Sequence, residues 1–101
     1  FSCLTLAETC DGASITTTGG LAEGGVLHPL QRAFMDAFAT QCGFCTPGMI
    51  MAAKALLDRN PNPTRDDVVE AISGNICRCT GYEPIIQAVL AAARSNSVSA
   101  A

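Results

Sequence analysis

The spacing of apolar side chains predicts helices along most of this chain. Apolar residues recur at intervals of three and four between Leu27 and Phe38, which places them on one face of a helix at about 28–39. A second apolar stripe predicts a helix at about 47–58. Pro47 suits the first turn of this second helix, because the N–H that proline lacks would have no partner there. These two helices predict a hairpin.

Two more helices are predicted in the second half of the chain. Thr64 is a suitable capping residue, and the acidic residues after it favour the positive end of a helix that continues through Ile72. Gly74 marks the end of this helix, because glycine readily adopts the conformation that closes a helix. A fourth helix starts near Pro84 and presents an apolar face as far as Leu90. The predicted fold class is therefore all-α, a four-helix bundle of two helical hairpins.

The two ends of the chain carry weaker patterns. Residues 1–7 and 15–18 contain apolar and β-branched side chains that favour short extended segments, but neither is long enough to build a sheet alone. From Ser95 onward, serine, alanine and asparagine predict a disordered tail. Because the chain begins with phenylalanine inside an apolar stretch rather than with methionine, we expect it to be a fragment that lacks an upstream part.

Composition and charge limit the possible partners. The 101 residues, of which 49% are hydrophobic, suffice for the core of one small domain. Six basic residues against nine acidic ones give a net charge of -3. This argues against nucleic acid as a partner, because its phosphates are bound mainly by clustered Lys and Arg. No apolar run reaches the roughly 20 residues of a membrane span, and no stretch resembles a signal peptide, so we expect a cytoplasmic protein.

Six cysteines are a high density for this length, and disulfides, reactive thiols and a metal site compete to explain them. Four of them form two close pairs, Cys42 with Cys45 and Cys77 with Cys79. A disulfide that closes so short a loop removes little entropy from the unfolded chain, so neither pair is a useful staple. With no sign of secretion into an oxidising compartment, metal binding is the favoured interpretation.

Each cysteine pair lies in the loop just before the second helix of its hairpin. If the hairpins pack about an approximate two-fold axis, both pairs meet where helix N-termini stabilise negative charge. Zinc in a structural site and iron with sulfide in an electron carrier are both compatible with four thiolates. The interval between Cys45 and Cys77 holds two predicted helices, so it is longer than the roughly 15 to 20 residues that separate the cysteine pairs of a zinc ribbon. This spacing favours iron without excluding zinc. A metal-free thiol redox sensor is a third candidate.

Two longer motifs around these cysteines resemble a known family. They are Gln41-Cys42-Gly43-Phe44-Cys45-Thr46-Pro47-Gly48-Met49-Ile50 and Gly74-Asn75-Ile76-Cys77-Arg78-Cys79-Thr80-Gly81-Tyr82. In this order they closely resemble the proximal-cluster domain of the molybdenum hydroxylases, the family of xanthine oxidase and aldehyde oxidoreductase, over about residues 28–92. The resemblance implies an oxidoreductase subunit that relays electrons from the molybdenum cofactor through 2Fe-2S clusters toward a flavin. The resemblance places no substrate site on this chain. The alternative function is that of a zinc-stabilised structural module.

The resemblance assigns the cysteines to clusters. It implies one complete 2Fe-2S cluster, with the ligands Cys42, Cys45, Cys77 and Cys79. Cys3 matches the last ligand of a second, incomplete cluster site, whose other ligands lie upstream. Residues 1–20 then resemble the end of a truncated ferredoxin-like domain and its linker. The helical iron–sulfur domain spans 21–94, and 95–101 form the tail.

The resemblance also implies contacts with partners. Gln41 and Cys79 match the positions that contact molybdopterin, the pterin of the molybdenum cofactor. The cofactor belongs to a molybdenum-cofactor-binding large subunit, and a flavin-binding medium subunit follows in the electron path. Either partner can be a domain of the same chain instead.

Other residues fit ordinary structural roles. Cys10 matches no ligand position and is explained as a plain thiol near a turn, and Met49 and Met51 are explained as core residues. His28, at a helix start, is assigned a capping or solvated role. For Arg78, a hydrogen bond near the cluster or a bound pyrophosphate and an ion pair with an acidic neighbour are open alternatives. Small residues in the motifs are expected to let backbone amides approach the sulfurs, namely Gly43, Gly48 and Gly81.

Overall fold

The computed structural model describes residues 4–22 and 25–100, which are mostly helical. The elements in chain order are the 3-10 helices η2 (Ala7–Cys10) and η3 (Thr18–Gly20) and the α-helices α1 (Pro29–Asp36), α2 (Thr46–Arg59), α3 (Arg65–Ile72) and α4 (Glu83–Ala100). No β-strand forms within these two ranges. The predicted all-α class is confirmed.

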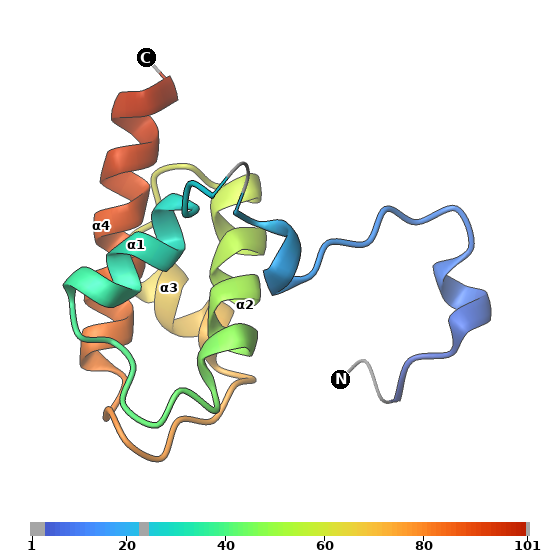
Figure 1. Ribbon diagram of the computed structural model, residues 1–101, viewed down its shortest axis with the longest axis horizontal. Coiled ribbons are helices and arrows are strands. Elements are labelled where there is room, and N and C mark those ends of the chain that lie inside the picture. The colour runs from blue at the N-terminus through green and yellow to red at the C-terminus, as the bar shows by residue number, and fades with distance from the viewer. Residues whose placement is uncertain (1–3, 23–24, 101) are drawn as a thin grey trace.

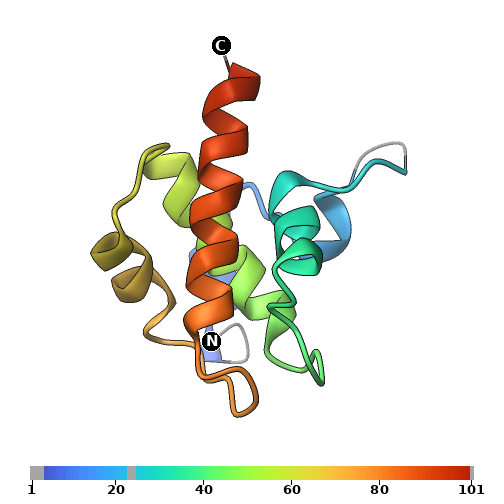
Figure 2. The same cartoon turned by 90° about the vertical axis from the view of Figure 1, so that its left-hand side faces the viewer.

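The α-helices form two hairpins that pack against each other. α1 packs mainly against α4, and α2 packs mainly against α3, so the chief neighbour of each helix belongs to the other hairpin. In Figures 1 and 2, α1 and α3 lie on opposite sides of a layer formed by α2 and α4. The helical bundle is therefore confirmed, and its approximate two-fold symmetry stays a prediction.

A capping box starts α1. The Nδ1 atom of His28 accepts a hydrogen bond from the backbone N–H of Leu30 at 3.1 Å. In return, the Oε1 atom of Gln31 accepts one from the backbone N–H of His28 at 3.0 Å. Two N–H groups that a helix start leaves without partners are thereby satisfied. Pro29 follows as the first helical residue, and the capping role predicted for His28 is confirmed.

α1 ends at Asp36, earlier than the predicted end at about residue 39. The backbone of Phe38 takes the left-handed conformation, with φ 53°. The N–H of Ala39 then donates to the carbonyl of Phe34 at 2.9 Å, and that of Phe38 donates to the carbonyl of Met35 at 3.3 Å. This pair of bonds is a Schellman closure, which usually has glycine at the left-handed position. The apolar pattern continued past this point, so the sequence did not mark the end.

The predicted cap of α3 is present, whereas the N-cap of α2 is Cys45 rather than the expected Thr46, and its side chain makes no capping bond. Pro47 lies in the first turn of α2, which begins at Thr46. Thr64 starts α3, and its hydroxyl accepts a hydrogen bond from the N–H of Asp67 at 3.3 Å. The Asp67 carboxylate accepts one from the N–H of Thr64 at 3.0 Å. This reciprocal pair confirms the predicted capping sequence.

One apolar core lies between the four helices. Each helix contributes its predicted apolar face, and the largest fully buried side chains are Phe34, Leu30, Met49, Ile85, Val68 and Val89. Met49 is therefore a core residue, as predicted, and Met51 packs partly buried against the same core. Cys77 is itself a member of this core cluster, so one of the predicted ligands is anchored in it.

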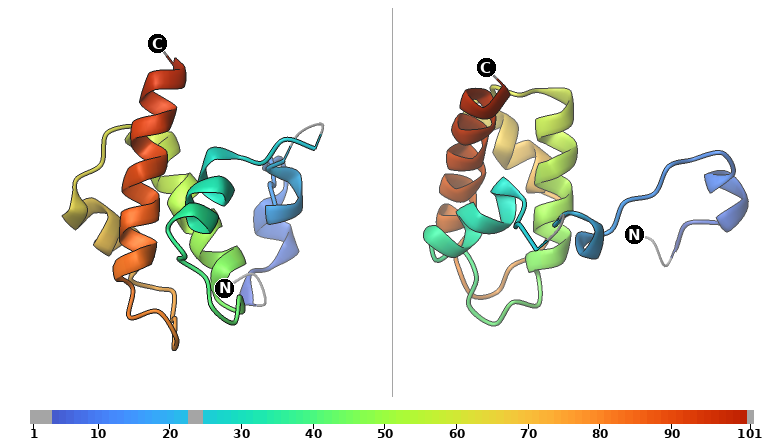
Figure 3. Two further views of the ribbon diagram at one scale, coloured as in Figure 1. Left: turned by 60° about the vertical axis from the view of Figure 1, so that its left-hand side comes forward. Right: turned by 45° about the horizontal axis from the view of Figure 1, so that its top comes forward.

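The N-terminal segment agrees with the prediction only in part. Where extended segments were expected at 1–7 and 15–18, the described residues form no strand: Thr17 is extended, but η2 begins at Ala7 and η3 at Thr18. Figures 1 and 3 show η2 held away from the helical bundle. Leu4 and Ile15 are 79% and 72% exposed, so this segment has no apolar cover in the described structure. Short apolar stretches form strands only when a neighbouring strand completes their hydrogen bonds.

The C-terminal helix is longer than predicted. Where a disordered tail was expected at 95–101, the backbone of α4 continues to Ala100. A run of alanines favours helix, and no glycine or proline follows Pro84 to end it. The domain boundaries stay a prediction. Among the described residues, no helix is both long and apolar enough to cross a membrane.

Candidate metal centre

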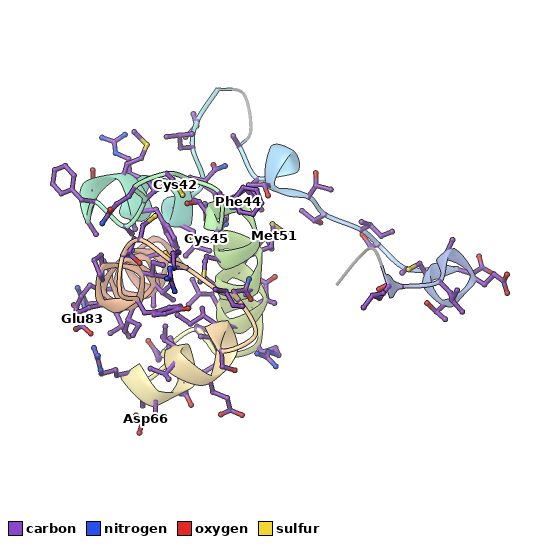
Figure 4. All side chains as sticks on the ribbon, turned by 90° about the horizontal axis from the view of Figure 1, so that it is seen from below. Cys42, Phe44, Cys45, Met51, Asp66 and Glu83 are labelled. Carbon is purple, nitrogen blue, oxygen red and sulfur yellow. The ribbon has the colours of Figure 1, made fainter. Side chains whose placement is uncertain are left out.

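The two cysteine loops lie at the same end of the bundle. One loop joins α1 to α2 and the other joins α3 to α4, and both appear at the bottom of Figures 1 and 2. α2 and α4 begin directly after these loops, so their N-terminal ends face the same region. Figure 4 views this end, with Cys42, Phe44 and Cys45 close together beside the start of α2.

The four sulfurs approach one another as pairs from opposite loops. The thiol of Cys79 lies 3.6 Å from Sγ of Cys42. After burial, the side chain of Cys77 also raises the pKa of Cys45, so these two thiols are neighbours across the loops. The two cysteines of each sequence pair therefore belong to different cross-loop pairs. Among the described residues, no group of three or more Cys, His, Asp or Glu side chains is arranged to hold a single metal ion.

The observed sulfur separation fits metal ligation. Two thiolates bound at tetrahedral angles to one metal ion, with bonds of about 2.3 Å, lie about 3.8 Å apart. The 3.6 Å between Cys42 and Cys79 is close to that value. Four thiol groups, in two cross-loop pairs at one end of the bundle, therefore supply the donor set that a binuclear iron–sulfur cluster needs.

The two cross-loop pairs differ in burial. Cys77 is 7% exposed and Cys45 is half-buried, whereas Cys42 and Cys79 are exposed. The inner pair touches the core, because Cys77 belongs to the buried cluster and Cys45 packs against it. A group held by all four sulfurs would have an inner side against the protein and an outer side facing solvent or a partner.

Hydrogen bonds and burial shift the pKa values of the four thiols in different directions. The Thr80 hydroxyl, helped by backbone amides of the loop, lowers the pKa of Cys77 to about 7. The backbone amide of Phe44 lowers the pKa of Cys42. Burial raises the pKa of Cys45, and the bond with Cys42 raises the pKa of Cys79. Each contact thus pairs a thiol that ionises readily with one that does not, and metal binding removes the remaining protons.

Left-handed turns shape both loops. Gly43 has φ 84° and Gly81 has φ 72°, a conformation that glycine adopts without strain. Tyr82 follows with φ 73°, although it is not glycine. At Gly48, a Cβ atom would come 3.0 Å from Nδ2 of Asn75. The small size of this glycine lets the start of α2 approach the other loop.

The remaining predicted site residues have separate positions. Gln41 is exposed, and within the described part of the chain its side chain makes no hydrogen bond. Arg78 is also exposed, and the ion pairs of the described residues do not include it. Cys10 lies in η2, far from the loops in sequence, with its thiol 3.9 Å from the carbonyl of Leu6. Cys3 lies outside the described residues.

Two residues at the site were not predicted. The Thr80 hydroxyl lies 3.1 Å from Sγ of Cys77, and the hydroxyl of Tyr82 accepts a hydrogen bond from the N–H of Cys77 at 3.0 Å. A threonine also follows Cys45, but the hydroxyl of Thr46 lies 2.9 Å from that of Thr40. The repeated Cys-Thr sequence was a usable signal, but which hydroxyl meets a sulfur depends on the backbone of the loop.

Comparison with known proteins agrees with this geometry. The family model described as a 2Fe-2S binding domain matches residues 17–90. The small subunit of nicotine 6-hydroxylase from Paenarthrobacter nicotinovorans is 57% identical over 89 residues, which are 88% of this chain and 53% of that subunit. The small FeS subunit of nicotinate dehydrogenase from Eubacterium barkeri is 53% identical over 88 residues, or 87% of this chain and 56% of that subunit. This chain spans about half the length of both.

Solved structures show the same fold. Quinoline 2-oxidoreductase from Pseudomonas putida 86 aligns with a TM-score of 0.86 and 50% identity, over 96% of this chain and 61% of that one. Aldehyde oxidoreductase from Desulfovibrio gigas aligns with a TM-score of 0.90 and 45% identity, over 96% of this chain and 11% of that one. Together with the family match, these relatives confirm the resemblance seen in the cysteine motifs. The chain belongs to the 2Fe-2S binding domain family, in the branch found in molybdenum hydroxylases.

Proposed function

We propose that Cys42, Cys45, Cys77 and Cys79 hold a 2Fe-2S cluster that relays electrons from a molybdenum cofactor toward a flavin. The observation that carries the proposal is the contact between Cys42 and Cys79, because it joins the two cysteine motifs at a distance suited to a shared metal. The match to a 2Fe-2S binding domain family supports iron with sulfide over zinc. When bound, such a cluster accepts and passes on one electron at a time.

The sulfur contacts further suggest how the ligands divide between the two irons. Cys42 and Cys79 would hold the outer iron, because their sulfurs are in contact, and the neighbouring Cys45 and Cys77 would hold the inner one. Each iron would then join the two hairpins. In this arrangement the cluster would link two loops whose described cysteines form no disulfide.

The exposed outer pair supplies a route for electrons. Cys79 is exposed at the end of the bundle and would receive electrons from the pterin of the cofactor, with Gln41 beside it as a hydrogen-bonding contact. A hydrogen bond from the pterin to a ligand sulfur shortens the electron-transfer path between the pterin and the cluster. Gln41→Ala should slow cluster reduction by substrate, because it removes the contact with the pterin. Iron content should stay unchanged, because the exposed Gln41 side chain makes no hydrogen bond to a described residue.

The proposal extends to the whole protein. The matched part of this chain spans only about half of the relatives named as small subunits, which leaves room for an upstream domain with a second cluster that includes Cys3. The partners would be a large subunit with the molybdenum cofactor and a medium subunit with the flavin, or equivalent domains. A cytoplasmic location is part of the proposal, because thiolate ligands are preserved in a reducing compartment.

Metal analysis and spectroscopy test the cluster directly. In the full protein, Cys79→Ala should lose two irons and two sulfides per chain, together with visible absorbance and the EPR signal of this cluster after reduction. Cys10→Ala is the matched control and should retain all of them, because Cys10 lies in η2. Zinc in place of iron, or equal metal content in both variants, would contradict the proposal.

A further inference from the structure

We propose that Thr80 sets the reduction potential of the cluster by donating a hydrogen bond from its hydroxyl to Sγ of Cys77. The inference rests on the proposed role of Cys77 as a ligand. It makes Thr80 a positioning and tuning residue that acts through a ligand sulfur. Two contacts carry it: Oγ1 of Thr80 lies 3.1 Å from Sγ of Cys77, and the N–H of Thr80 donates to the same sulfur at 3.4 Å.

A third hydrogen bond leaves the Thr80 hydroxyl free to donate, and the charge state of a bound cysteine sets the direction. The backbone N–H of Tyr82 lies 3.1 Å from Oγ1 of Thr80. A backbone N–H can only donate, so the hydroxyl oxygen is the acceptor in this bond and its own hydrogen is left for another partner. A metal-bound cysteine carries no proton and can only accept. In the loaded protein, therefore, the hydrogen between Thr80 and Cys77 belongs to Thr80.

The loop backbone holds this arrangement in place. Gly81 and Tyr82 are consecutive left-handed residues, with φ 72° and 73°, and this double turn brings the N–H of Tyr82 back to Thr80. The Tyr82 hydroxyl accepts from the N–H of Cys77 at 3.0 Å, which closes a ring of hydrogen bonds through Cys77, Thr80 and Tyr82. The left-handed conformation is strained for tyrosine, and the hydrogen bonds of the ring oppose that strain.

Hydrogen bonds to a ligand sulfur favour the reduced cluster. Reduction adds negative charge to the cluster and its sulfurs, and a donor that points at a sulfur stabilises the added charge. The effect is strong at Cys77 because the residue is buried, where water competes little for the sulfur. The hydroxyl of Thr46 in the other loop lies 2.9 Å from that of Thr40, and it opposes the rise in the pKa of Cys45 that burial causes. Thr80 is the stronger candidate, because its hydroxyl lies 3.1 Å from the sulfur of a buried cysteine.

A redox titration of the full protein tests the inference, with the EPR signal of this cluster as the readout. Thr80→Val removes the hydroxyl and keeps the branched shape. At a fixed applied potential it should lower the ratio of reduced to oxidised cluster by up to about tenfold, the value of one hydrogen bond of about 1.4 kcal/mol. Thr80→Ser retains the donor and should restore the ratio. Ser73→Ala is a control, because the Ser73 hydroxyl donates to the carbonyl of Glu70 and should leave the ratio unchanged.

The outcomes separate this inference from the proposed function. A wild-type protein without two irons and two sulfides at this site would overturn the cluster itself. A fully loaded Thr80→Val protein with an unchanged potential would leave the cluster standing and overturn the role of Thr80. If both Thr80→Val and Thr80→Ala fail to retain iron, Thr80 is needed to build the loop, which also overturns the tuning role.

Discussion

Phe38 adopts a backbone conformation that bulky side chains rarely take. Its φ of 53° closes α1, yet its ring is 83% exposed and gains little from packing. Phe38→Gly should therefore stabilise the protein by about 1 kcal/mol, because glycine takes this conformation without strain. The midpoint of urea unfolding measures the change.

Phe44 offers a matched control for that substitution. Its ring is 94% exposed, and it is not among the residues with positive φ. Phe44→Gly should leave the midpoint unchanged or lower it, since glycine only adds freedom to the unfolded chain there. A Phe38→Gly protein less stable than wild type would show that the Phe38 ring makes a stabilising contact that outweighs its strain.

His28 makes the cap of α1 sensitive to pH. Burial, followed by the positive charge of Lys54, lowers the pKa of His28, while Asp58 opposes them. The neutral ring accepts the hydrogen bond from Leu30, and a protonated Nδ1 cannot. Because the folded pKa lies below the unfolded value of about 6.5, the folded state resists protonation. Stability from this cap is present above about pH 6.5 and is lost as pH falls through the folded pKa.

A comparison of two proteins isolates this effect. Wild type should lose about 1 kcal/mol of unfolding free energy as pH falls across that window, the usual value of a helix cap. His28→Ser keeps a capping oxygen that does not titrate, so its loss over the same window should be smaller. Identical pH profiles for the two proteins would show that other groups cause the change.

At the scale of elements, Gly48 lets the first turn of α2 pass close to the loop before α4. A methyl group there would meet Nδ2 of Asn75 at 3.0 Å. Gly48→Ala should therefore fail to give the stabilisation of about 1 kcal/mol that alanine normally brings to a helix. Asn75→Ala should recover it, so the double variant should be more stable than the sum of the single changes predicts.

Gly74 provides the control for this cycle. It lies in the loop just after α3, where a Cβ atom would meet no other atom within 4 Å, and its φ is not positive. Gly74→Ala should be neutral or slightly stabilising, with or without Asn75→Ala. If Gly48→Ala behaves in the same way, the approach of the two elements tolerates a methyl group, and the size of Gly48 is unimportant.

At the scale of the whole molecule, the proposed cluster should stabilise the joint between the hairpins. Its four ligands come from two loops, and ligand binding stabilises only the state in which they are together. Removing iron should increase amide hydrogen exchange in residues 40–46 and 75–82 and change the centres of α2 and α4 less. Equal increases along the entire chain would mean that the cluster supports the core as well.

The sequence predicted the elements of this fold better than their ends. Helix positions follow from the spacing of apolar residues, and the Thr64 cap follows from residue type, because both are local properties. The end at Phe38 depends on an exposed aromatic residue in a conformation that composition does not indicate. The helical backbone after Ser95 was missed because serine and asparagine suggest a tail, although no breaker stops the helix.

The candidate site shows the same division. Cysteine spacing and the family resemblance predict four ligand sulfurs, and the structure brings Cys42 and Cys79 together across the loops. Thr80 and Tyr82 were not predicted, because their bonds to Cys77 require two successive left-handed residues. The backbone of a loop, rather than its residue types, decides which polar group meets a sulfur.

The interleaved packing of the two hairpins sets an order of events during protein synthesis. α1 is made before α4, although α4 is its chief neighbour. A nascent chain that stops before residue 77 offers only Cys42 and Cys45, half of the sulfurs in the proposed site. Domains generally fold as complete units as the chain emerges. We therefore expect iron and sulfide to be inserted only after the domain has been fully translated, which excludes unfinished chains from the assembled enzyme.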